Sequence, residues 1–205
     1  MTIRYEIIGV EQGTPEWFEA RRGMPTASRF ADILAEGKGL MRARYLRQLA
    51  GEIITGEPME TYTNEKMERG KKDEPLLRTK YCFEKEIDVV QVGFIKMNPL
   101  LCKTGCSPDG LVGDNGMVEI KSAAPDVLLE LLDGGKRSKE HYAQVQGQLW
   151  ITGKEWCDLV IGCPKMPKLM IDRIDRDEHY MALLANRLRQ FNAELSDLVI
   201  RHGAP

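Results

Sequence analysis

The stretch SPDGLVGDNGMVEIKS, residues 107–122, contains three carboxylates, Asp109, Asp114 and Glu119, and one ammonium group, that of Lys121. Asp109 follows Ser-Pro, and Glu119 and Lys121 stand two residues apart in a short apolar run. Side chains two residues apart in a β-strand point to the same face. We therefore expect Glu119 and Lys121 to project together, while Ile120 between them points into the core.

These residue types suit a magnesium site for phosphodiester hydrolysis. Mg²⁺ takes hard oxygen ligands, commonly one or two carboxylates, and keeps several waters. Asp109 and Glu119 could supply the carboxylates, and the backbone carbonyl of Ile120 could be a further ligand. Hydrolysis also needs a group that orients the water and a cation that offsets the developing charge. The ammonium of Lys121 could serve both purposes.

The pattern acid-x-Lys is weak by itself, because it occurs twice in the chain. Glu36-Gly37-Lys38 lies beside glycines with no predicted strand to hold it, whereas Glu119 and Lys121 follow Asp109 across a turn. On spacing alone, an ordinary ion pair between Glu119 and Lys121 on an exposed strand explains the residues as well as a metal site does.

Periodicity and turn residues predict the elements that must position this stretch. In the first half we expect helices from Thr14-Pro15 to about Arg22, from Thr26 to about Gly37, over 40–54, and from Asn64 into the 80s with a break or kink at Pro75. Strands are then expected at 87–97, in LLCKTGCS, and on both sides of an Asn-Gly-type turn in DGLVGDNGMVEIKS. The second half predicts helices in PDVLLELLDGG, 139–150 and 177–201, and strands in WCDLVIGC and KLMIDRI.

This order of elements predicts an α/β fold in which one mixed central β-sheet is flanked by helices. The chain has 205 residues, enough for one domain with a sizeable core, and no repeat or linker divides it. We therefore expect a single domain over residues 1–205.

Composition excludes several classes of protein. The net charge is -2, so any DNA binding must come from a local patch or channel. The sequence contains no run of about 18 apolar residues, which a membrane-spanning helix would need, and no signal peptide is recognisable. We therefore expect a cytoplasmic protein. The three histidines are scattered and the five cysteines contain no C-x-x-C pair, which argues against a zinc or iron–sulfur site.

The chain resembles a known nuclease family. Asp109, Glu119 and Lys121, with Pro108 before the aspartate, match the motif of the PD-(D/E)xK nuclease superfamily. Over most of its length the chain is similar to lambda exonuclease and its YqaJ-type phage recombinase relatives, in the blocks EQGTPEWFEARRGMPTAS, RGKKDEP, CSPDGL, VEIK and AQVQGQLW. Several blocks in the right order are more specific than the three-residue core. The resemblance implies a restriction-endonuclease-like core.

The resemblance implies roles for the central residues. Asp109 and Glu119 would be metal ligands, the Ile120 carbonyl an additional ligand, and Lys121 the catalytic lysine. The cofactor would be Mg²⁺, with two ions per site, and Mn²⁺ could substitute.

Two further residues gain a site role from the matching blocks. Glu74, in RGKKDEP, would line the active site, and Gln144, in AQVQ, would face the catalytic centre. Taken alone, Glu74 is equally a solvated helix charge paired with Lys71 or Arg78. A helical glutamine is, by itself, most often a surface residue.

The resemblance also implies a site for the 5′-phosphate of the shortened strand. Arg21 and Ser28 match residues that hold this group, and Lys38 and Ser107 could add a cation and a hydroxyl. A guanidinium together with hydroxyl donors is well suited to a phosphate. The alternative is an exposed arginine and a serine that caps a helix.

The activity implied is 5′-to-3′ digestion of one strand of duplex DNA, with release of mononucleotides and a 3′ single strand left for annealing. The family forms a ring-shaped homotrimer around DNA and works beside a single-strand annealing protein. Two basic clusters, Lys66 to Lys72 and Lys136 to Lys139, could then track phosphates inside a ring.

Two other functions remain open at this point. A PD-(D/E)xK endonuclease of restriction or repair type would share the metal chemistry but would not need a DNA end. A non-catalytic DNA-end-binding recombination adaptor would keep the fold only, although binding alone does not require Asp109, Glu119 and Lys121 together.

Overall fold

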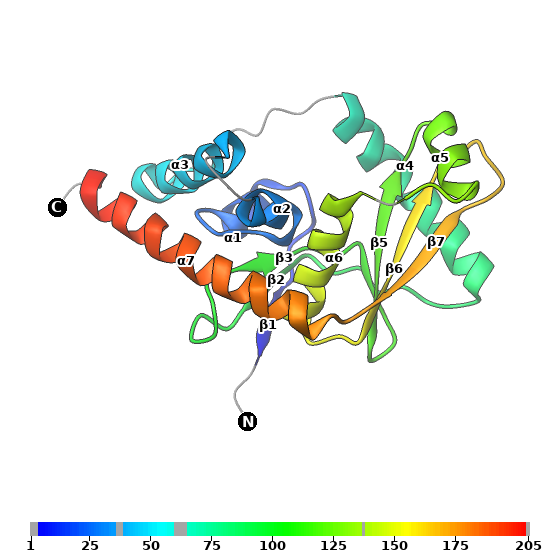
Figure 1. Ribbon diagram of the computed structural model, residues 1–205. Helices are drawn as coiled ribbons and strands as arrows, with labels where there is room; N and C mark the ends of the chain where they lie inside the picture. The colour runs from blue at the N-terminus through cyan, green and yellow to red at the C-terminus, as the bar shows by residue number, and fades with distance from the viewer. Residues whose placement is uncertain (1–3, 36–38, 60–64, 137, 204–205) are drawn as a thin grey trace.

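The computed structural model describes residues 4–35, 39–59, 65–136 and 138–203 (Figure 1). After a short first strand, a run of helices is followed by a run of strands, then by two helices, two strands and a long final helix. The elements are β1 (Tyr5–Ile8), α1 (Pro15–Arg21), the 3₁₀ helix η1 (Ala27–Arg29), α2 (Phe30–Leu34), α3 (Leu40–Thr55), α4 (Glu65–Lys85), β2 (Phe94–Met97), β3 (Gly105–Cys106), β4 (Gly110–Val112), β5 (Gly116–Ser122), α5 (Pro125–Leu132), α6 (Lys139–Thr152), β6 (Trp156–Gly162), β7 (Met170–Asp175) and α7 (Glu178–His202).

The strands form two sheets. The larger has the order β4-β5-β6-β7, in which β5 and β6 are parallel and the two outer pairs are antiparallel. Helices cover it, so the prediction of a mixed central sheet flanked by helices is confirmed. The smaller sheet, β1-β2-β3, is antiparallel and was not predicted.

Helix α6 lies between the two halves of the molecule, with the larger sheet on one side and the N-terminal helices and the smaller sheet on the other (Figure 1). Its Val145 and Leu149 pack with Met117 and Leu159 of the larger sheet. On its other side the helix fits closely against η1 and α2, where a Cβ on Gly147 would come within 2.3 Å of the Phe30 ring. Helix α6 therefore ties both halves together through its buried faces.

Strand β5 alternates its side chains between two helices. Met117 belongs to the cluster built with α6, whereas Val118 and Ile120 pack with Leu77 and Tyr81 of α4. The period of two that is inherent to a strand thus turns odd-numbered residues of β5 toward α6 and even-numbered residues toward α4. Ile120 points into the core as expected.

The helix starts largely follow the capping residues in the sequence. Thr14 accepts a hydrogen bond from the Trp17 N–H at the start of α1, and Asp177 accepts one from the Tyr180 N–H at the start of α7. Thr26 precedes η1 without making such a bond. Asn64, which was expected to cap α4, lies outside the described residues.

Some expectations about elements were wrong. Helix α4 continues through Pro75, so of the break or kink expected there, the break is not found. Of the strand expected at 87–97, only Phe94–Met97 forms β2, and Val90 makes an isolated bridge to Leu111. The hairpin of β4 and β5 exists, but Val112 pairs with Gly116, and the intervening loop begins with Gly113 at a φ of 54°. The Asn-Gly pair is therefore not the centre of the turn.

No described helix combines the length and apolar character needed to cross a membrane. All five cysteines are free, and four of them are buried.

Candidate active site

The carboxylates of Asp109 and Glu119 meet where the β4–β5 hairpin begins and where β5 runs beneath α6. Both residues are buried, and Glu119 is only 2% exposed. The Ile120 N–H donates a 2.6 Å hydrogen bond to Oδ2 of Asp109. This bond holds the turn before β4 against β5, so the aspartate is fixed by the same strand that carries the glutamate.

Three donors converge on the Glu119 carboxylate. Its Oε1 accepts from the Lys121 ammonium and from Nε2 of Gln144, both at 2.6 Å. Its Oε2 accepts from Nε2 of Gln148 at 2.7 Å. Glu119 and Lys121 do form an ion pair, but on a buried strand, so the reading as an exposed surface pair does not hold.

Helix α4 brings a third carboxylate to this group. Glu74 is partly buried and pairs with Arg78, one helical turn later. Its carboxyl is close enough to Glu119 and Lys121 for both to influence its pKa. The neighbouring Asp73 accepts a 2.5 Å hydrogen bond from the Ser122 hydroxyl at the end of β5. The ion pair that sequence reasoning offered as the alternative is therefore present, and it lies at the edge of the acidic group.

The electrostatics of the group are dominated by burial and by repulsion between acids. Burial, then the charges of Glu119 and Glu74, raise the pKa of Asp109 well above its usual value. Burial also raises the pKa of Glu74, against the lowering effect of Arg78. For Lys121, burial lowers the pKa, but the carboxylates of Glu119 and Asp109 outweigh it and the net shift is upward. Lys121 is thus held as an ammonium.

The donor set fits a hard divalent cation that keeps part of its water. Within the described part of the chain, no three His, Cys, Asp or Glu side chains are arranged to hold a metal by themselves. Mg²⁺ does not need such a cage, since one or two carboxylates with waters suffice. Among the described residues, Oδ1 of Asp109 makes no hydrogen bond, and burial, followed by the negative charge of Glu119 and Glu74, raises the pKa of Asp109. A cation beside Asp109 and Glu119 would offset that charge.

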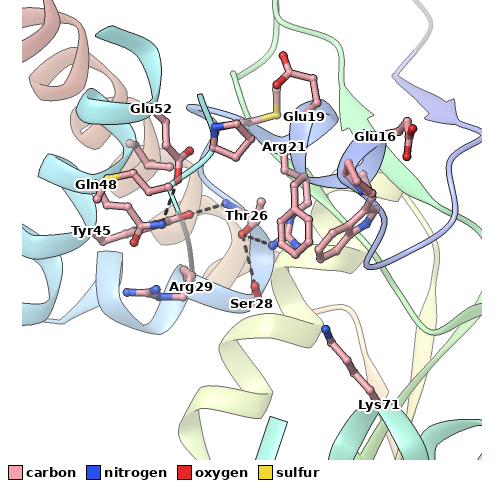
Figure 2. A pocket seen from close by; sticks show the side chains of 17 residues that line it. Glu16, Glu19, Arg21, Thr26, Ser28, Arg29, Tyr45, Gln48, Glu52 and Lys71 are labelled. Carbon is pink, nitrogen blue, oxygen red and sulfur yellow. Dashed lines mark hydrogen bonds between the residues drawn. The ribbon is translucent and has the colours of Figure 1, made fainter. Parts of the chain in front are cut away.

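A second group of predicted residues lines a cavity of about 1430 Å³ between α1, η1, α3 and α4. Figure 2 shows Arg21, Thr26 and Ser28 close together in it. The Arg21 guanidinium lies 3.4 Å from the Thr26 hydroxyl, which is 3.3 Å from that of Ser28. Lys71 extends from α4 into the same cavity. Arg21 and Ser28 are thus brought together, as predicted.

Trp17 holds Arg21 in place. The guanidinium carbon lies 3.7 Å from the centre of a Trp17 ring, a cation–π contact. Burial lowers the pKa of Arg21 to about 10, so the side chain remains charged at neutral pH. The indole N–H of Trp17 donates a 2.9 Å hydrogen bond to the hydroxyl of Ser107, two residues before Asp109. One side chain therefore connects the arginine cavity to the loop that carries the aspartate.

The structure does not describe every predicted residue. Lys38 lies outside the described residues, as does Arg137 of the second basic cluster. Of the first basic cluster, Lys71 reaches the cavity. Ser107 lies next to Trp17 and is not a lining residue of the cavity, so a direct hydroxyl contact to a group bound there is not supported.

Sequence reasoning missed three residues of these sites. Gln148 contacts Glu119, and Trp17 and Thr26 organise Arg21. The spacing of Gln148 four residues after Gln144 on one helix was a usable signal, because such residues share a face. The same spacing links Trp17 to Arg21 on α1, whereas no local signal marks the contact of Trp17 with Ser107, 90 residues away.

Comparison with known proteins decides the family. The model of the YqaJ-like viral recombinase domain matches residues 16–155, more than half of the chain. The chain belongs to this family. No curated protein sequence matches significantly. The matched range begins within α1 and ends before β6, so it contains Arg21, Glu74, Asp109, Glu119, Lys121 and Gln144.

Three solved structures of two proteins are similar to this chain, at different levels of sequence identity. The alkaline exonuclease LHK-Exo from Laribacter hongkongensis is 36% identical, with a TM-score of 0.83 over 92% of this chain and 95% of that one. Its complex with dAMP gives a TM-score of 0.84 over the same shares. A phage-related exonuclease from Haemophilus somnus 129PT is 12% identical, with a TM-score of 0.68 over 87% of this chain and 96% of the other, which shows a shared fold.

Proposed function

We propose that this protein is a Mg²⁺-dependent 5′-to-3′ exonuclease of double-stranded DNA, which releases mononucleotides and leaves a 3′ single strand for recombination. The observation that carries the proposal is the pairing of two sites: buried carboxylates with a lysine on β5, and a separate cavity with a buried arginine. The 36% identical relative is an alkaline exonuclease and was solved with dAMP, a nucleoside monophosphate of the kind released by such an enzyme.

The metal would be held by Asp109, Glu119 and the backbone carbonyl of Ile120, and Mn²⁺ should substitute for Mg²⁺. When bound, two such ions supply an activated water and stabilise charge on the phosphate. Lys121, held as an ammonium by Glu119, orients the attacking water and offsets negative charge on the scissile phosphate. Gln144 holds Oε1 of Glu119 by its hydrogen bond. Glu74 adds a further carboxylate on the side of the site that faces α4.

The cavity with Arg21 supplies the preference for an end. A 5′-phosphate would be bound by the guanidinium of Arg21, the hydroxyl of Ser28 and the ammonium of Lys71, all of which line the cavity. Each cut by a 5′-to-3′ exonuclease creates a new 5′-phosphate on the shortened strand. A site for this group sets the position of the next scissile bond and draws the strand forward after each cut.

The assembly would be a homotrimeric ring that works beside a single-strand annealing protein. The proposal of a ring rests on the family to which the chain belongs and on the small size of the basic surfaces of a single copy. The net charge of -2 gives no general attraction to DNA, so several copies of a small basic surface would have to face one channel.

One experiment tests the activity and its competitors. Linear duplex labelled separately at each 5′ and 3′ end is digested by the purified protein with Mg²⁺, and covalently closed circular DNA is incubated in parallel. We expect early release of the 5′ label as a mononucleotide and no attack on the circle. Cutting of the circle would favour the endonuclease, and DNA binding without cleavage would favour the adaptor. Early release of the 3′ label would overturn the polarity.

A further inference from the structure

Gln148 is buried in α6 beside the proposed metal ligands and has no role in the function described so far. It is 1% exposed. Its Nε2 donates a 2.7 Å hydrogen bond to Oε2 of Glu119, while Lys121 and Gln144 both use Oε1. Among the described residues, Gln148 is thus the side chain that donates a hydrogen bond to the second oxygen, Oε2, of the Glu119 carboxylate.

The other end of the Gln148 amide is unsatisfied. Its Oε1 is buried and has no hydrogen-bond donor among the described residues. A buried polar atom left without a partner costs about 1 to 3 kcal/mol. Packing stability alone therefore does not account for a glutamine at this position, because an apolar side chain of similar length would avoid that cost. The amide must be explained by the group that it does contact.

That contact restricts how the Glu119 carboxylate can turn. A carboxylate held at one oxygen can still rotate about the bond that joins it to the side chain. Donors on both oxygens, from Gln144 and from Gln148 one helical turn later, fix the plane of the group. Side chains that hydrogen-bond a metal ligand in this way orient it, and their loss commonly costs 10- to 100-fold in metal affinity or activity.

We propose that Gln148 is a positioning residue that fixes the orientation of Glu119 for Mg²⁺ binding. The inference rests on the metal site of the proposed function. It adds a residue that acts on the metal only through Glu119 and that touches neither DNA nor the reacting atoms. Its loss should weaken Mg²⁺ binding, whereas saturating Mg²⁺ should restore most of the cleavage rate.

Helix α6 itself supplies a matched control. Gln146 is 0% exposed, and both ends of its amide are hydrogen-bonded: its Nε2 donates to the Asp175 carbonyl and its Oε1 accepts from the Asp177 N–H. It has the same residue type and burial on the same helix, and its partners lie at the end of β7 and just before α7 instead of in the acidic group. Gln146→Met should lower the melting temperature without changing Mg²⁺ affinity.

The experiment measures Mg²⁺ binding by calorimetry without DNA, then the Mg²⁺ concentration for half-maximal cleavage, for wild type, Gln148→Met and Gln146→Met. We expect a 10- to 100-fold weaker Kd in Gln148→Met only, and recovery of its rate at saturating Mg²⁺. Gln148→Asn, which keeps the amide but is one methylene shorter, should weaken binding in the same direction and serves if the methionine variant does not fold.

The outcomes separate this inference from the function on which it rests. A wild-type protein that binds no divalent cation would overturn the proposed metal site itself. A wild type that binds Mg²⁺, with unchanged or tighter binding in both Gln148 variants, would overturn only the role of Gln148. Equal losses of affinity in Gln148→Met and Gln146→Met would show a general effect of helix destabilisation and would also overturn it.

Discussion

The arginine cavity gives the sharpest test of how the protein recognises a DNA end. We predict that wild type digests 5′-phosphorylated duplex faster than 5′-hydroxyl duplex, and that Arg21→Ala loses most of this difference. The Arg21 guanidinium is already stacked on Trp17 and only loosely bonded, at 3.4 Å, to Thr26. Its remaining donors are therefore available to a phosphate, and little ordering is needed when one binds.

The magnitude follows from the kind of bond that is lost. A hydrogen bond to a charged group contributes about 1.5 to 3 kcal/mol, and each 1.36 kcal/mol is a tenfold change in rate. Loss of one such bond should reduce the ratio of kcat/KM between the two substrates by roughly 10- to 150-fold. Arg21→Lys keeps the charge but loses the planar fork and its stacking, so we expect it to keep only part of the preference.

The neighbouring arginine is a matched control. Arg22 has its guanidinium paired with Glu19 at 2.7 Å and does not line the cavity, so Arg22→Ala should leave the ratio unchanged. The assay compares kcat/KM on both substrates at fixed salt for all four proteins. If Arg21→Ala keeps the full preference, or if wild type has none, the reasoning about the cavity is wrong and the assignment of 5′-to-3′ polarity weakens with it.

Three further predictions concern the acidic group. Asp109→Asn should abolish cleavage while the metal-free protein melts at the same or a higher temperature, because one of several repelling carboxylates is removed; a melting temperature clearly below wild type would contradict this. Lys121→Arg should lower the cleavage rate nearly as much as Lys121→Ala if the lysine places the attacking water. A Lys121→Arg rate within about tenfold of wild type, which is about 1.4 kcal/mol of barrier, would show that the lysine only offsets negative charge. Burial and the charge of Lys121 lower the pKa of His141, so the unfolded chain binds the proton more tightly and stability should fall as pH drops below about 6.5. Chemical unfolding between pH 5 and 8 should show a smaller loss of stability at low pH for His141→Gln than for wild type. Parallel curves of stability against pH would exclude His141 as a source of the pH dependence.

Local patterns predicted those parts of the fold that depend on neighbours in sequence. The β4–β5 hairpin, α5, α6, β6, β7 and α7 were found from turn residues and periodicity. Strand β1 was missed although Tyr5, Ile7 and Ile8 are strand-forming residue types. It is only four residues long, and its partner β2 lies about 90 residues later. For the same reason most of 87–97 was wrongly expected to be a strand: Phe94–Met97 has partners on both sides and the residues before it largely do not.

Those residues of the site could be predicted that stand in the sequence blocks matching the nuclease family. Asp109, Glu119 and Lys121 do meet, and Arg21 and Ser28 do share a cavity. The contacts that orient them could not be read from the sequence. Whether Gln144 and Gln148 point at Glu119 depends on how α6 packs on β5, and the link from Trp17 to Ser107 depends on the placement of two distant segments.

Most residues of the two sites come from different parts of the chain, although α4 contributes to both, with Lys71 in the cavity and Glu74 in the acidic group. Asp109, Glu119, Lys121, Gln144 and Gln148 fall within forty consecutive positions, whereas α1, η1 and α3, which form most of the cavity wall, all precede residue 60. The two regions are nevertheless not separate bodies, because Phe30 and Leu49 of the N-terminal helices share one buried core with Leu188 of α7. Trp17 also bonds to Ser107, and Phe30 fits over Gly147 of α6. Exchange of the segments before residue 60 between homologues would therefore have to keep their core contacts with α6 and α7, if a nuclease is to recognise a different DNA terminus while cutting by unchanged chemistry.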